Sequence, residues 1–136
     1  MSTTSAIALS GLKVAELRLQ ASAINVANAL SDGPLPESAG LSAFPAAYTP
    51  PPLRINQIDT AAGGTSGRIG LVPPVYVRGF DPTAPRANAN GLVARPNVDL
   101  ASELVQQILA RVSFAANAQV LQADAHTTAA LLDIKV

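Results

Sequence analysis

The side chains of this chain that could take part in acid–base or nucleophilic chemistry are few and form no known constellation. His126 is the single histidine, and Asp124 stands two residues before it, a spacing that puts the two side chains on different faces of a helix. We therefore interpret His126 as a solvent-facing or packing residue. A serine nucleophile would have only this histidine as its base, and no nucleophile-elbow motif is present.

Two carboxylates do have the spacing of one helix face. Asp99 and Glu103 are four residues apart, but no histidine, cysteine or further acid accompanies them. Capping of a helix or exposure to solvent therefore explains them better than catalysis. The chain has no cysteine, which excludes disulfides, thiolate metal sites and a cysteine nucleophile.

A glycine-rich run and a set of arginines are the remaining candidates. Residues 63–68 lack the lysine followed by Ser/Thr, and the helix after it, that a phosphate-binding loop needs, and we interpret 61–67 as a mobile loop. The arginines of the middle segment form either a protein-binding face or solvated strand edges, and both interpretations stay open. These arginines are Arg54, Arg68, Arg78, Arg86 and Arg95.

Composition excludes further classes of function. The net charge is +0, with no basic patch for nucleic acid and no acidic tail. We predict no enzyme activity, no small-molecule substrate, no metal and no cofactor. The N-terminus lacks the basic region and long apolar run of a cleaved signal peptide, and no window reaches the ~18 apolar residues of a membrane span. We therefore predict no direct membrane insertion.

Any function must be carried by two helical segments at the ends of the chain, because all eleven prolines lie between them. The first is predicted over 5–31, capped by Thr3, Thr4 or Ser5 and stopped at Gly33. The second is predicted from 97 to 132, with Asn97 or Asp99 as its cap. Both have a seam of mainly apolar or small residues that step by four and three. The first seam is Ser10, Val14, Leu17, Ala21, Ile24 and Asn28, and the second is Leu104, Ile108, Arg111, Ala115, Ala118, Gln122, Ala125, Ala129 and Leu132.

The segment between the helices reads as short strands and turns. Alternating runs at 53–55, 68–72 and 75–77 predict two to four strands, and Asn90-Gly91 is a hairpin-type turn signal before Leu92-Val93. The predicted fold class is mainly α with a small β/loop insert, the long N- and C-terminal helices pairing as a coiled-coil-like bundle. We predict a discontinuous terminal-helix domain at 1–32 and 97–136, and a proline-rich β/loop domain at 33–96.

The end segments resemble a known family. The run RLQASAINVAN at 18–28 is similar to the N-terminal signature of bacterial flagellar axial proteins. ANALS at 27–31 matches the Ala-Asn-x-x-Thr element of that family with a serine hydroxyl. SFAANAQVL at 113–121 resembles the C-terminal signature. FDP, NGLV and PNVD, between 80 and 99, resemble the flagellar basal-body rod proteins, in particular the proximal rod group.

This resemblance implies a structural subunit of the basal-body rod. The terminal helices of such proteins pack with other subunits into a tube, a drive shaft that transmits torque and lets export substrates pass. The implied partners are other copies of the chain, other rod proteins and the flagellar type III export apparatus. The implied location is the periplasmic rod of the basal body, reached without a cleaved signal peptide.

The predicted assembly interface follows the two helical seams. Asn25 and Asn28 are expected to fix register there, as polar residues at such seams can. Another flagellar axial paralogue, from the rod or a rod junction, and a non-flagellar helical adaptor module remain the alternatives. The interface residues are Val14, Leu17, Ala21, Ile24, Asn25, Asn28, Leu104, Ile108, Ala115, Asn117, Ala118, Leu121, Ala125 and Leu132.

Overall fold

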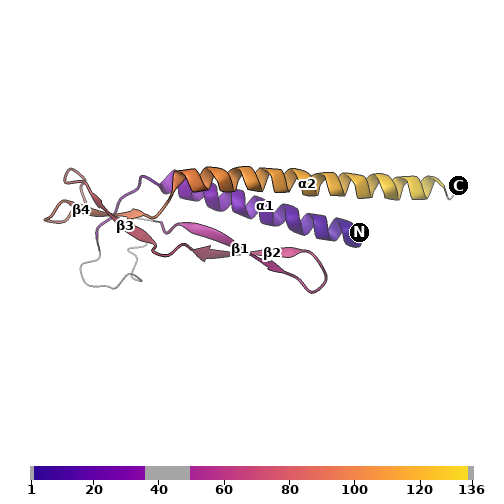
Figure 1. Ribbon diagram of the computed structural model, residues 1–136, viewed down its shortest axis with the longest axis horizontal. Coiled ribbons are helices and arrows are strands. Elements are labelled where there is room, and N and C mark those ends of the chain that lie inside the picture. Colours follow the sequence, from indigo (N-terminus) through magenta and orange to yellow (C-terminus); the bar gives the residue numbers. More distant parts are fainter. Residues whose placement is uncertain (1, 36–49, 135–136) are drawn as a thin grey trace. The chain divides into compact units, whose positions relative to one another are not determined.

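The computed structural model describes residues 2–35 and 50–134. It consists of two long helices, with four strands between them in the sequence, which confirms the predicted fold class (Figure 1). Parts of the predicted domains, at 1, 36–49 and 135–136, lie outside the described residues. The elements in chain order are α1 (Thr3–Asn28), β1 (Leu53–Asp59), β2 (Thr65–Leu71), β3 (Tyr76–Phe80), β4 (Leu92–Pro96) and α2 (Leu100–Asp133).

Helix α1 begins earlier than the sequence pattern indicates. Its cap is Ser2, whose Oγ accepts a hydrogen bond of 3.0 Å from the Ser5 backbone N–H. The predicted caps Thr3, Thr4 and Ser5 are wrong, because all three residues are already helical. The hydroxyl of Ser2, just before the helix, accepts from one of the unpaired N–H groups of the first turn instead.

The end of α1 also differs from the prediction. The helix ends at Asn28, and the Ser31 hydroxyl and backbone N–H both donate to the Asn28 carbonyl, at 2.7 and 3.0 Å. Gly33 is not a left-handed helix stop, as predicted, but pairs with Ala94 in an antiparallel bridge. The two backbone hydrogen bonds of this bridge, at 2.9 and 2.8 Å, require an extended Gly33.

Helix α2 begins at Leu100, three residues after the predicted start at 97, and uses the second of its two predicted caps. Asp99 is its cap: the Ala101 N–H donates to Oδ1 at 3.1 Å and the Ser102 N–H donates to Oδ2 at 3.3 Å. The helix has 34 residues, and Glu103 lies in its first turn, where a negative charge is favourable. Neither described helix is long and apolar enough to cross a membrane.

The chain divides into two compact units, and α1, β1, β2 and α2 each contribute to both. The first unit comprises Met1–Gln20, Ile55–Arg68 and Gln106–Val136. Within it α1 and α2 are antiparallel, since Ser5 bonds Asp124 while Gly11, further along α1, lies against Asn117, earlier in α2 (Figure 1). The buried apolar side chains of this unit are small, which permits a short distance between the helices: Ala8, Val14, Ala15 and Ala110.

The hairpin of β1 and β2 includes part of the predicted glycine-rich loop. Gly63 and Gly64 have φ of 76° and 97°, and they close the turn between the strands. Thr65–Gly67, predicted to belong to a mobile loop, instead lie in β2. That part of the prediction is wrong because the run was read from its glycines, and pairing with β1 extends the strand through Gly67.

The second unit comprises Ala21–Arg54 and Ile69–Val105, and its core is built on β3 and β4. These strands are antiparallel, with Tyr76 opposite Pro96 and Phe80 opposite Leu92. The turn predicted at Asn90-Gly91 is present, with Gly91 at φ 71°, but it ends a longer loop instead of a two-residue hairpin. The buried side chains here include Pro52, Tyr76, Val93 and Ala94. The predicted division at 32/33 and 96/97 stays a prediction.

Candidate functional site

The residues with reactive side chains do not come together. His126 is exposed, and Asp124 accepts hydrogen bonds from the hydroxyls of Ser2 and Ser5 instead of facing the imidazole. These two hydroxyls lower the pKa of Asp124 below its ordinary value. Within the described residues, no group of three or more His, Cys, Asp or Glu side chains could hold a metal ion.

The carboxylate pair Asp99 and Glu103 splits into two structural roles. Asp99 caps α2 and also accepts a hydrogen bond from the Ser102 hydroxyl, which is the main cause of its lowered pKa. Glu103 turns to α1, where its Oε1 accepts a hydrogen bond of 2.7 Å from Asn25 Nδ2. The structure therefore gives Asp99 the predicted capping role and gives Glu103 a partner that the sequence did not indicate.

One arginine of the middle segment forms an ion pair. Arg95 donates through Nη2 to Asp81 Oδ2 at 3.1 Å. Both side chains are partly exposed to solvent, and exposed ion pairs contribute little to stability. The Thr83 hydroxyl, bound to Asp81 Oδ1 at 2.8 Å, is the main cause of the lowered pKa of Asp81, and the Arg95 charge adds to it. Arg54, Arg68 and Arg78 are exposed on their strands.

The predicted interface residues of α1 are partly used by the chain itself. Val14 and Ala21 are buried, and so is Asn25, at 2% exposed. Ile24, next to Asn25, is 44% exposed. The buried face of α1 is therefore turned away from Ile24 and runs through Ala8, Val14, Ala15, Ala21, Ser22 and Asn25.

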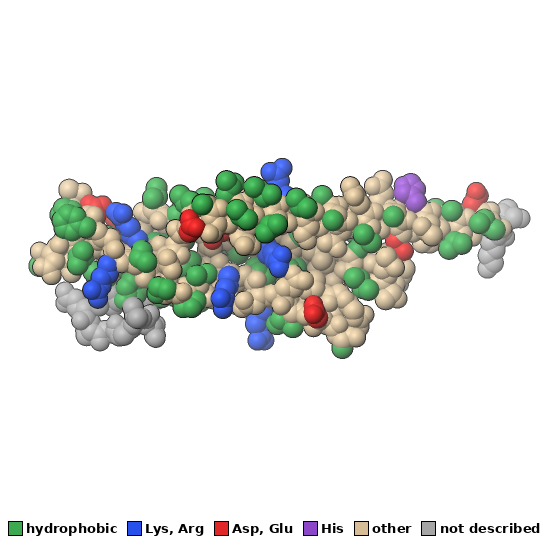
Figure 2. Space-filling view, in the orientation of Figure 1, with side chains coloured by type: hydrophobic (Ala, Val, Ile, Leu, Met, Phe, Trp, Pro, Cys, Tyr) green, Lys and Arg blue, Asp and Glu red, His purple; other side chains and the backbone are tan. Residues whose placement is uncertain are grey.

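Helix α2 exposes most of the interface residues predicted on it. Leu104 is 59% exposed, Ile108 is 52% exposed and Leu132 is 66% exposed, while Ala110 is the one buried residue of this helix. Figure 2 shows apolar side chains gathered along the first half of α2, and Val105, Leu109 and Val112 are exposed there too. Ala115 and Ala125 are exposed as well; Leu17, Asn28, Asn117, Ala118 and Leu121 are half-buried.

An exposed apolar surface of this length is unusual for a chain that stays alone. Monomeric proteins rarely leave large contiguous apolar patches in water, and such patches mark interaction sites. A helix that carries apolar side chains on several sides needs neighbours to cover them. What this surface can do is therefore bind other apolar surfaces.

The clearest polar site in the second unit is centred on Asn25. Its Oδ1 accepts a hydrogen bond from the Leu53 N–H, and its Nδ2 donates to the Leu53 carbonyl, both at 2.7 Å. Its Nδ2 also donates to Glu103 Oε1 at 2.7 Å. One turn earlier in α1, the Ser22 hydroxyl donates to the Glu103 carbonyl at 3.2 Å. One buried amide therefore connects α1, β1 and α2.

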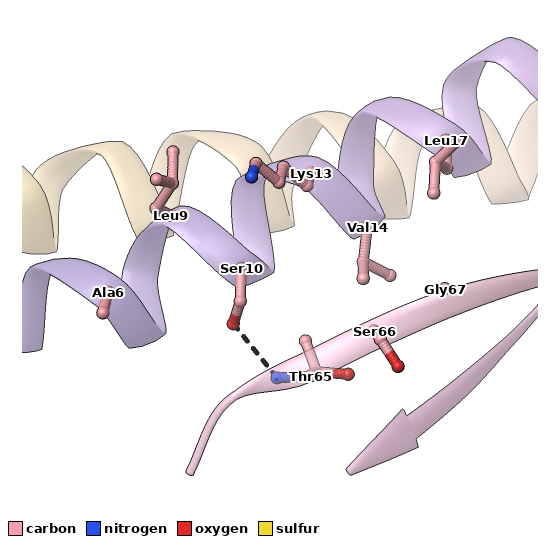
Figure 3. Close-up of a pocket in the computed structure, with 9 residues that line it drawn as sticks. All are labelled: Ala6, Leu9, Ser10, Lys13, Val14, Leu17, Thr65, Ser66 and Gly67. Atoms are coloured by element: carbon pink, nitrogen blue, oxygen red, sulfur yellow. Dashed lines mark hydrogen bonds between the residues drawn. The ribbon is translucent and has the colours of Figure 1, made fainter. Parts of the chain in front are cut away.

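A groove of about 390 Å³ lies between α1 and β2 in the first unit. Figure 3 shows Ser10 and Val14 pointing toward β2, and the Ser10 hydroxyl accepts a hydrogen bond of 3.0 Å from the Thr65 N–H. A Cβ at Gly67 would lie 3.1 Å from Leu17 Cδ1, so the strand approaches the helix closely here. Lys13 is the one ionisable residue of the lining, which offers no acid–base pair for chemistry.

Sequence reasoning missed the contacts that join helix to strand. The Asn25–Leu53 and Ser10–Thr65 hydrogen bonds connect residues 28 and 55 positions apart. The available signal was a polar side chain in an otherwise apolar part of a helix. That signal marks a buried polar group in need of partners, but it does not name them.

Known flagellar proteins are similar to this chain. It is 29% identical over 134 residues to the flagellar basal-body rod protein FlgC of Agrobacterium fabrum, covering 98% of this chain and 94% of that protein. It is 34% identical over 70 residues to proteins of the same name from Salmonella typhimurium and Salmonella typhi, covering 48% of this chain and 52% of each relative. No protein-family model matches the chain. The resemblance to basal-body rod proteins that the signature residues indicated is confirmed.

Proposed function

We propose that this chain, similar over nearly its whole length to basal-body rod proteins, is a structural subunit of the bacterial flagellar rod. The observation that carries the proposal is that similarity, together with the exposed apolar surface of α2. A subunit whose apolar surface is covered only by its neighbours is stable in an assembly and incomplete alone.

The proposed assembly uses both terminal helices. Their parts at 1–32 and 97–136 form the domain that packs against neighbouring subunits, and 33–96 forms a smaller appended domain. The exposed side chains Ile24, Leu104 and Ile108 are the contacts made with other subunits. Small buried residues such as Ala15 and Ala110 hold α1 and α2 close within the chain.

The mechanism that follows is mechanical. Many apolar contacts between subunits make a tube that resists twisting, so that it transmits torque and leaves a channel for export substrates. We propose that the chain lies in the periplasmic part of the basal body and is delivered by the flagellar type III export apparatus without cleavage. The partners are other copies of the chain and other rod proteins.

The test is complementation of a strain from which this gene has been deleted. The strain should not swim, and the unsubstituted gene should restore swimming. Ile108→Glu should leave the helix content of the purified chain unchanged, because the side chain is already 52% exposed, yet remove the chain from purified basal bodies. Gln106→Glu, which puts the same charge on an exposed position of the same helix, is the matched control and should swim.

Two results would refute the proposal. A deletion strain that swims normally would favour a non-flagellar adaptor. Normal incorporation of the Ile108→Glu chain into basal bodies would show that the exposed face of α2 is not an assembly surface.

A further inference from the structure

The amide of Asn25 pairs with both backbone groups of a single residue, Leu53. Successive residues of a strand point their backbone groups in opposite directions, so a shift of β1 by one residue would turn these groups away. Asn25 would then keep a buried donor and a buried acceptor without partners, because it is only 2% exposed. The Asn25 side chain is therefore fully hydrogen-bonded in one register of β1 and not in the neighbouring ones.

The same amide also selects a register of α2. The Glu103 carboxylate accepts a hydrogen bond from Asn25 Nδ2, and the Glu103 backbone carbonyl accepts one from the Ser22 hydroxyl. Leu104, the next residue, has no side-chain acceptor to offer in its place. Fixing the register of paired helices is the best attested role of polar residues buried among apolar ones.

We propose that Asn25 and Glu103 are positioning residues that hold α1, β1 and α2 in one register within the second unit. By doing so they fix how Ile24 of α1 and Leu104 of α2, both exposed, are presented to a neighbouring subunit. The presentation half of this proposal rests on the proposed function in the rod. The register half concerns the chain alone.

Asn28 provides a matched control in the same helix. It is the same residue type three positions later, but its Nδ2 donates to the Ile24 carbonyl of its own helix at 2.8 Å. A bond within one helix cannot select a register between elements. The register role predicted for both asparagines therefore belongs, in our proposal, to Asn25.

The first experiment measures amide hydrogen exchange at Leu53 in the purified full-length chain. The Leu53 N–H should be protected, since its partner is the buried Asn25 Oδ1. Asn25→Leu should lower that protection by about tenfold or more, because it removes the amide partner of the Leu53 N–H, the Leu53 carbonyl and Glu103 Oε1. Asn28→Leu, the same change at the control position, should leave it unaltered.

The second experiment separates positioning from simple loss of packing. Asn25→Asp sets a second carboxyl group against Glu103, and two carboxylates that share a site raise the pKa of one of them. Leu53 protection should then be low at about pH 7.5 and recover at about pH 5, where one shared proton restores a hydrogen bond. Adding Glu103→Gln should restore protection at both pH values, because a glutamine amide donates to the carboxylate.

The charged residues near position 25 and Glu103 do not interfere with this pH dependence. Asp99, four residues before Glu103, is engaged as the cap of α2, and Arg54 follows Leu53 in β1. Within the described part of the chain, neither side chain makes a hydrogen bond or ion pair with Glu103; Asp99 contacts it through the backbone, where the Glu103 N–H donates to the Asp99 carbonyl at 3.0 Å. Helix α1 contributes no charged residue after Arg18.

Each result has a defined consequence. An unprotected Leu53 amide in the unsubstituted chain, equal loss of protection in Asn25→Leu and Asn28→Leu, or a pH dependence of Asn25→Asp that Glu103→Gln does not remove would each overturn the register half. Normal swimming of Asn25→Leu cells, with Leu53 protection lost, would overturn the presentation half. A deletion strain that swims would refute the rod function and leave the exchange results standing.

Discussion

Gly11 of α1 faces Asn117 of α2 at a close approach of the two helices in the first unit, and substitutions there can measure how close that approach is. A Cβ at Gly11 would lie 2.5 Å from Asn117 Oδ1 and 2.7 Å from its Cγ, far inside normal contact. The Asn117 side chain is held by a 2.8 Å hydrogen bond from its Nδ2 to the Ser113 carbonyl. It cannot move aside for a methyl group without losing that bond.

The magnitude of Gly11→Ala follows from two opposing effects. Alanine is favoured over glycine in a helix interior by about 1 kcal/mol. Forcing an extra carbon into a packed contact costs about 1–3 kcal/mol. The single substitution should therefore lower the free energy of unfolding by about 1 kcal/mol, taking the middle of that range.

The same substitution should have the opposite sign when Asn117 is shortened. In an Asn117→Ala background the overlapping atoms are absent, so Gly11→Ala should raise the free energy of unfolding by about 1 kcal/mol. The coupling between the two positions is then about 2 kcal/mol, within the range for residues in contact.

The assay is urea unfolding of the full-length chain and the three variants, followed by circular dichroism at 222 nm. If Gly11→Ala stabilises the chain equally in both backgrounds, the helices do not approach at this point and the reasoning fails. A coupling of the expected sign with unchanged m-values would support it.

Two further predictions concern pH and the isolated chain. Hydrogen-bond donors lower the pKa of Asp81, Asp99 and Asp124 below the ordinary 3.8. The stability that these carboxylates contribute is therefore fully present above their unfolded pKa. It is lost as the pH falls through their folded pKa. The melting temperature should therefore be flat from about pH 8 to about pH 5 and fall below about pH 4, and an unchanged value at about pH 2.5 would contradict this. The terminal helices are expected to fray in the dilute chain, first in α2 after Asp124, where every described residue is exposed. Hydrogen exchange should show fast amides there and slow ones near Ala110, whereas uniform protection to the end of α2 would contradict the expectation.

The positions of the helices were predictable because local signals agree along the chain. The confinement of the prolines to 34–96 leaves the ends free to be helical, and Asp99 is a strong cap at the correct place. The strands were predictable from alternating residues between prolines, though not their exact ends. The cap was misplaced because several hydroxyls lie close together near Ser2, and the stop at Gly33 was wrong because that residue pairs with the distant Ala94.

The buried face of each helix was harder to predict, for a physical reason. Alanine on several sides of a helix gives nearly the same burial in several rotations, so the predicted seam through Ile24 and the buried face through Asn25 could not be separated by pattern. Asn25 became the buried member because Leu53 and Glu103 satisfy its amide together. Those partners are 28 and 78 residues away, and only the fold brings them near.

The sequence by itself therefore determined the element types, a cap of α2 at Asn97 or Asp99 and the resemblance to rod proteins, because each depends on residues that are close along the chain. The tertiary structure alone decided that Asn25 is enclosed while Leu104 and Ile108 stay exposed. The buried amide of Asn25 finds its hydrogen-bond partners in residues far away in the sequence, so it is satisfied only when α1, β1 and α2 pack together.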